Sequence, residues 1–131
     1  MSDDESMLLR KRLEVILAAL QRIPRRFTDI TEPRDFISSE EGFDRLDSIC
    51  MILIAAGEEF KKIDRQTKGE LFNQYPQVPW RGAIGLRDVL AHAYFQADPE
   101  QIYVICRDRV PVLIETVQQI IQDLESSTGS K

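Results

Sequence analysis

Residues 38–63 read SSEEGFDRLDSICMILIAAGEEFKKI, and this stretch decides the fold class. It opens with Ser38 followed three residues later by Glu41, a capping-box pattern that predicts the start of a helix. Apolar residues then recur at helical spacing, and the window 49–56 is apolar nearly all round. The stretch therefore predicts a long helix to about Ile63, either central in a bundle or in contact with a second subunit. The side chains expected to face inward are Phe43, Leu46, Ile49, Cys50, Leu53, Ile54 and Phe60.

Three further segments carry helical periodicity. Residues 7–23 form a stripe of leucine and isoleucine, and we expect Pro24 to stop this helix. A third helix is expected over residues 80–97, after a rigid segment that contains two prolines. A fourth runs over residues 98–125, where Asp98 is the expected N-cap and Pro111 should introduce a kink. No alternating strand pattern occurs, so the sequence predicts an all-α antiparallel bundle of four to five helices.

The length of 131 residues suits one domain over residues 1–131, with flexible tails at about 1–6 and 126–131. The longest apolar run is well short of the roughly 20 residues that a membrane span needs. The acidic start of the chain is unlike a signal or transit peptide, so we expect a cytoplasmic protein that does not enter a membrane. The net charge of −5 counts against wrapping of duplex DNA but leaves room for a local RNA site.

The cysteines and the single histidine offer little to a metal ion. Cys50 and Cys106 lie within apolar helical patterns, and no CxxC motif is present. Two buried free thiols are therefore expected, with no metal site and no cofactor. The alternative to metal-free chemistry is a metal ion held by carboxylates. Between Pro76 and Gln96 the charged residues are Arg81, Arg87 and Asp88, which makes this part of an acidic chain locally positive.

The only histidine lies in the segment RDVLAHAY, residues 87–94. A helix turns by about 100° per residue, so Arg87 and Tyr94 share one stripe whereas His92 points roughly 140° away from Arg87. Asp88 is four residues before His92 and can reach its ring. One helix thus presents two adjoining edges, one with Arg87 and Tyr94 and the other with Asp88 and His92.

These residue types fit RNA cleavage without a metal. Histidine can take the proton of a 2′-OH or protonate the leaving oxygen, and arginine can stabilise the charge that develops on the phosphorane. Because Arg87 and His92 diverge on one helix, a shared site is easier if two copies pack across a twofold axis. The alternative is a surface ion pair of Asp88 with His92 beside ordinary helix-surface residues.

The motif Arg87-x4-His92-x-Tyr94 resembles the Arg-x4-6-His signature of the HEPN superfamily. The neighbouring residues PQVPWR (76–81) and GLRD (85–88), followed by Tyr94-Phe95 and Asp98, are similar to the HepT-like toxin family. The resemblance extends more loosely to residues 46–62 and to the last helix with its proline. It covers most of the chain from about Met7.

The resemblance implies an all-helical, HEPN-like homodimer that acts as an endoribonuclease toxin on RNA. Arg87 and His92 would be the catalytic pair in a cleft at the dimer interface, and Asp88 would support His92. The partner would be a minimal nucleotidyltransferase antitoxin, which uses ATP to transfer AMP onto Tyr94. Family members often carry Asn where this chain has Asp88. A second reading is a non-catalytic HEPN subunit that dimerises and docks a nucleotidyltransferase or a nucleotide.

Overall fold

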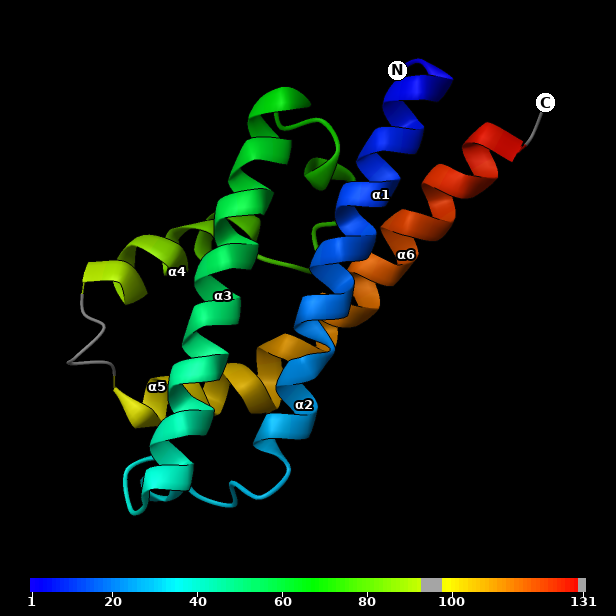
Figure 1. The fold of residues 1–131 in the computed structure, drawn as a ribbon. Helices are drawn as coiled ribbons and strands as arrows, with labels where there is room; N and C mark the ends of the chain where they lie inside the picture. The colour runs from blue at the N-terminus through cyan, green and yellow to red at the C-terminus, as the bar shows by residue number, and fades with distance from the viewer. Residues whose placement is uncertain (93–97, 130–131) are drawn as a thin grey trace.

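The computed structural model describes residues 1–92 and 98–129, with only the backbone described at His92, Thr128 and Gly129. The described chain is helical and contains no strand, so the all-α fold expected from the sequence is confirmed (Figure 1). The α-helices are α1 (Asp3–Leu20), α2 (Arg22–Phe27), α3 (Glu40–Gln66), α4 (Trp80–His92), α5 (Pro99–Val104) and α6 (Val110–Gly129). Short 3-10 turns, η1 (Pro33–Phe36) and η2 (Phe72–Gln74), and a π-helical turn, η4 (Ile105–Arg109), connect them.

Helix α1 lies between α3 and α6 and runs antiparallel to both (Figure 1). Helix α4 packs on α3 at the side of the bundle away from α6. Within the described residues, no helix combines the length and the hydropathy that crossing a bilayer requires. The main packing partner of α4, which carries the segment of interest, is therefore α3.

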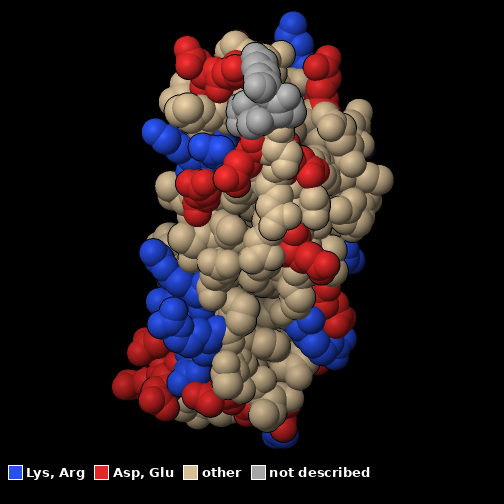
Figure 2. Space-filling model, turned by 90° about the vertical axis from the view of Figure 1, so that its right-hand side faces the viewer, with Lys and Arg blue, Asp and Glu red and all other residues tan. Residues whose placement is uncertain are grey.

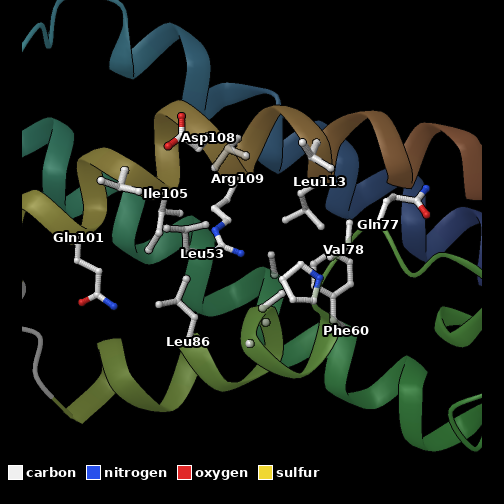
Figure 3. A pocket seen from close by; sticks show the side chains of 18 of the residues that line it. Leu53, Phe60, Gln77, Val78, Leu86, Gln101, Ile105, Asp108, Arg109 and Leu113 are labelled. Carbon is white, nitrogen blue, oxygen red and sulfur yellow. The ribbon is translucent and has the colours of Figure 1, made fainter.

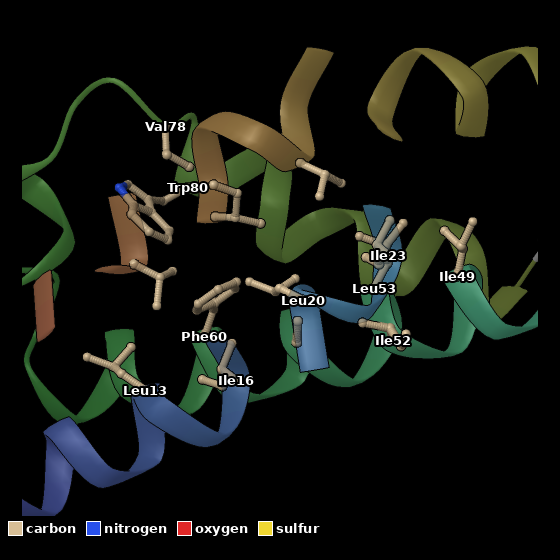
Figure 4. Close-up of a cluster of buried hydrophobic side chains, with 14 of the residues drawn as sticks. Leu13, Ile16, Leu20, Ile23, Ile49, Ile52, Leu53, Phe60, Val78 and Trp80 are labelled. Carbon is tan, nitrogen blue, oxygen red and sulfur yellow. The ribbon is translucent and has the colours of Figure 1, made fainter. Parts of the chain in front are cut away.

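The apolar stripes predicted from spacing form the core (Figure 4). Leu13 and Leu20 of α1 are fully buried, and they face the buried side of α3 around Leu53 and Phe60. Burial of such side chains contributes roughly 1.5–3 kcal/mol each, which offsets much of the entropy lost on ordering the helices. The prediction of an interior face was wrong for Phe43, which is 47% exposed.

The start of α3 lies one residue later than predicted. Ser39, not Ser38, is the N-cap, and its Oγ accepts the backbone N–H of Gly42 at 3.0 Å. The Ser38 hydroxyl instead donates to the carbonyl of Arg34 in η1. Gly42 faces the η1 backbone, where a Cβ would approach the carbonyl oxygen of Asp35 to 2.1 Å. The neighbouring Phe43 is therefore directed past η1 into solvent.

Both boundaries of the first helix also differ from the prediction. Helix α1 begins at Asp3 with Ser2 as its N-cap, so part of the expected flexible lead is helical. The first helix ends at Leu20 and not at Pro24, which lies in the first turn of α2. A proline is tolerated there because the first N–H groups of a helix have no intrahelical partner.

The kink expected at Pro111 takes the form of the π-helical turn η4, directly before α6. A proline ring collides with the carbonyl four residues earlier in a regular helix, and a π turn is one way to relieve that collision. Cys50 and Cys106 are buried free thiols, as predicted. Burial raises the pKa of Cys50 to about 11 and that of Cys106 to about 12, so both stay protonated near neutral pH.

Candidate functional site

The start of α4 is held by aromatic residues from three elements. The ring of Trp80 stacks on Phe72 with centroids 4.0 Å apart and meets Phe60 of α3 edge-on at 5.4 Å. Its indole N–H donates to the carbonyl of Tyr75 at 2.9 Å. The Tyr75 hydroxyl donates to Asp123 of α6 at 2.6 Å, and burial together with this carboxylate raises the pKa of the tyrosine. Helix α4 is thus tied at its first residue to α3, η2 and α6.

A glycine sets the distance between α3 and α4. A Cβ built on Gly57 would lie 3.0 Å from the Cβ of Arg87 and 3.3 Å from the carbonyl oxygen of Ala83. Any larger residue would push the two helices apart, because backbone atoms cannot yield as a flexible side chain can. Gly57 therefore places the first side-chain atom of Arg87 directly against α3.

The guanidinium group of Arg87 is engaged by two carboxylates. Its Nε forms an ion pair with Glu58 of α3, and its Nη1 pairs with the neighbouring Asp88. The Arg87 side chain is half-buried, while Asp88 is exposed. A carboxylate and a phosphate present similar oxygen pairs to a guanidinium group, so this position can bind a phosphate once Glu58 and Asp88 yield.

Glu58 was missed by the sequence reasoning. It is separated from Arg87 by the last turns of α3, the connecting segment with η2 and the first turns of α4, and spacing within one helix cannot reveal a partner on another. The sequence did contain one signal for this contact. Directly after the apolar window of α3 comes Gly57, a small residue that allows another helix to approach, and then the charged residue Glu58.

Of the residues predicted from the sequence to form the site, the structure describes the side chains of some and not of others. Arg87 and Asp88 are brought together on α4, with the contact between them as an addition to the prediction. Position 92 lies on the last turn of α4, four residues after Asp88. The side chain of His92 and the whole of Tyr94 fall outside the described residues, so the pairing of Asp88 with His92 and the alignment of Arg87 with Tyr94 stay predictions.

A pocket of about 960 Å³ lies between α3, α4 and the segment formed by α5, η4 and α6 (Figure 3). Its lining is largely apolar and includes Leu53, Leu86 and Ile105. Arg109 points from η4 into the pocket. Helical spacing places Leu86 on the side of α4 opposite to Asp88, so this pocket and the acidic edge of the motif are separated by the α3–α4 contact.

Comparison with known proteins gives consistent findings. The sequence model of the family described as Ribonuclease HepT-like matches residues 16–120. The protein named "Putative RNase MJ0127" of Methanocaldococcus jannaschii is 45% identical over 78 residues, which cover 60% of this chain and 61% of that protein. "Putative RNase MJ1380" of the same organism is 30% identical over 92 residues, covering 70% of this chain and 78% of that protein.

The chain matches only 61% of the length of the first of these relatives. A third protein of the same organism, "Putative RNase MJ0125", is 30% identical over 78 residues, covering 60% of this chain and 64% of its own length. No solved structure matches the chain significantly.

Proposed function

Because this chain belongs to the HepT-like ribonuclease family of the HEPN superfamily, we propose that it is a metal-independent endoribonuclease and the toxin of a toxin–antitoxin pair. Arg87 and His92 perform the cleavage. His92 takes the proton of the 2′-OH, the freed oxygen attacks the adjacent phosphorus, and the bond to the 5′-oxygen breaks as protonated histidine donates a proton to that oxygen, which yields a 2′,3′-cyclic phosphate. Arg87 stabilises the charge on the phosphorane. The observation that carries this proposal is the half-buried guanidinium of Arg87, located by Gly57 on the helix that also carries position 92.

In this proposal two copies of the chain pair, so that Arg87 and His92 of both copies contribute to one cleft. Exposed apolar side chains near the large pocket support such pairing: Val104 of α5 is 42% exposed and Val112 of α6 is 39% exposed. Val89 of α4, which is 51% exposed, adds apolar surface close to the motif. A second copy that covered these side chains would remove them from water.

Purified protein incubated with RNA in the presence of EDTA tests the proposal directly. Cleavage that leaves cyclic phosphate ends is expected, because the reaction uses only the side chains of Arg87 and His92. An EDTA-resistant activity that left 3′-hydroxyl ends would contradict the proposed transesterification, and so would the complete absence of cleavage.

Replacement of Glu58 by glutamine is expected to lower the KM for RNA by about two- to fivefold, since half-exposed ion pairs of this kind contribute roughly 0.2–1 kcal/mol. The reason is competition: in the structure Glu58 occupies the guanidinium that an RNA phosphate must bind. The neighbouring Glu59, which pairs with Arg12 and Lys62, provides the matched control Glu59→Gln, for which no change in KM is expected. A rise in KM for Glu58→Gln would show that the pair prepares Arg87 for RNA and does not compete with it.

The alternative is a non-catalytic subunit that dimerises and docks a nucleotidyltransferase or a nucleotide. The pairing of Arg87 with both Glu58 and Asp88 favours this alternative. A guanidinium group that already pairs with two carboxylates stabilises the negative charge of a phosphorane less well. Asp88→Asn separates the two readings. It raises the rate of RNA cleavage if the chain is a ribonuclease restrained by Asp88, and it produces no cleavage if the chain only binds.

The proposed antitoxin is a minimal nucleotidyltransferase that acts in the cytoplasm and transfers AMP from ATP onto Tyr94. Helical spacing predicts that Tyr94 shares a stripe with Arg87, so an AMP group on Tyr94 would carry a phosphate toward Arg87 and exclude RNA. Incubation of this chain with that partner and ATP is expected to add the mass of AMP, and Tyr94→Phe is expected to abolish the addition. Tyr75→Phe and Tyr103→Phe are the control variants. If the Tyr94→Phe variant were modified to the same extent as the parent, the residue that accepts AMP would be a different one.

A further inference from the structure

A second cleft lies on the other side of the α3–α4 contact, with a volume of about 560 Å³. It is bounded by the last turns of α3, the turn that follows them and the first turns of α4. Lys61 and Arg65 of α3 and Arg81 of α4 line it together, although 16–20 residues separate them in sequence. One carboxylate, that of Asp64, also lines the cleft, so its local charge is positive by two in a chain whose net charge is −5.

The three cations of this cleft are free to bind an anion. Among the described residues, none of Lys61, Arg65 and Arg81 forms an ion pair, whereas the adjacent Lys62 pairs with Glu59 at 3.5 Å. The face formed by α1 and α6 differs, since acidic and basic side chains there are mixed around a band of uncharged ones (Figure 2). The cleft is thus a local concentration of positive charge in a chain whose net charge is negative.

The floor of the cleft consists of Phe72 and Trp80. These rings are 1% and 9% exposed and stack on each other, so neither offers a free face to a nucleobase. Recognition in this cleft therefore rests on charge, which suits the phosphates of a nucleic acid strand and gives no preference for base sequence.

Helix α4 connects the cleft to the motif along one face. Arg81 and position 92 are eleven residues apart, close to three full turns, which corresponds to about 16 Å along the helix axis. Gly85 lies between them on the same face and also lines the cleft. A Cβ at Gly85 would meet no atom within 4 Å, so the surface of α4 is open at this position.

We propose that Lys61, Arg65 and Arg81 form a phosphate-binding subsite for the RNA strand, a few nucleotides away from the bond that is cleaved near Arg87 and His92. This inference rests on the proposed ribonuclease function. The subsite holds the strand and takes no part in the chemical step. Its loss therefore raises KM and leaves kcat unchanged.

The test measures binding of fluorescent single-stranded RNA to the His92→Ala chain by anisotropy over a series of salt concentrations. Combined replacement of the three cations (Lys61→Gln, Arg65→Gln, Arg81→Gln) is expected to weaken binding by about tenfold or more and to reduce the slope of log K against log salt by about 2, since each neutralised phosphate contributes about 0.7 on a single strand. The matched control removes the same charge elsewhere, through Lys11→Gln, Arg34→Gln and Lys62→Gln.

Equal weakening in the control chain would overturn the subsite, because the effect would then come from net charge alone. Unchanged RNA affinity of the cleft variant would overturn it as well, and loss of nucleotidyltransferase binding in that variant would then identify a protein-docking surface. The proposed ribonuclease function is tested separately, by measuring RNA cleavage by the parent chain, in which His92 is intact. If the parent binds RNA through the cleft but does not cleave it, the subsite stands and the ribonuclease assignment fails.

Discussion

Replacement of His92 by alanine is expected to lower the rate of RNA cleavage in EDTA by about 10²- to 10⁴-fold, the contribution that a positioned general acid or base makes. Arg87→Ala is expected to lower kcat by about 10²- to 10³-fold, the usual effect of removing one hydrogen-bond donor that stabilises a developing oxyanion. Both values are measured as kcat on a defined RNA. Arg87→Lys is expected to remain impaired, because an ammonium group cannot reproduce the two parallel hydrogen bonds of a guanidinium group.

Two controls accompany these variants. Lys11→Ala removes an exposed cation of α1, away from α4, and is expected to leave kcat unchanged. Equal cleavage by the parent and by His92→Ala would remove His92 from the mechanism. A mixture of the Arg87→Ala and His92→Ala chains, unfolded and refolded together, tests the shared cleft. Activity above that of either variant alone is expected if residues of two copies act in one site.

Replacement of Phe60 by alanine is expected to lower the free energy of unfolding by about 3–5 kcal/mol, the usual cost of removing a fully buried aromatic ring. Phe60 is 1% exposed, and its ring meets both Phe72 and Trp80. The loss leaves a cavity between α3 and the start of α4. Urea unfolding at a fixed protein concentration measures the change, with the fluorescence of Trp80 as the probe, since it is the only tryptophan of the chain.

Met51→Ala is the matched control, because Met51 lies on the same helix and is 63% exposed. A change within about 0.5 kcal/mol is expected for a surface position of this kind. If Phe60→Ala proved as stable as Met51→Ala, the aromatic cluster would not be what holds α4 in place. A destabilisation of Met51→Ala close to that of Phe60→Ala would indicate that α3 is covered by a second copy at that point.

The fold class was predictable because apolar residues, which become buried, recur at helical spacing along each helix. Leu13, Leu20 and Phe60 lie on stripes that periodicity alone identifies, and all three are buried. The helix starts were harder, since Ser38 and Ser39 are equally good caps in a local pattern. Only the contact of Ser38 with the η1 carbonyl and the close approach at Gly42 decide between them, and both depend on where the preceding turn lies.

The site was predictable only along one helix. Spacing placed Arg87 and Asp88 on adjoining edges of α4 and did not predict the ion pair that the structure shows between them. It could not supply Glu58, nor the convergence of Lys61 with Arg81, because both contacts cross from α3 to α4. Such contacts depend on the angle and depth at which two helices pack, which in this chain depends on a single glycine.

That glycine also divides the surface of α4 into two compartments. Gly57 brings the backbone of α4 against α3, and the apolar pocket near Leu86 and the cationic cleft near Arg81 lie on either side of that contact. Arg87 lies at the wall itself. A rigid-body roll of α4 over Gly57 would alter both compartments together, and it would carry Arg87 with it. Sensitivity of the guanidinium to both compartments is therefore inherent in the way these two helices touch.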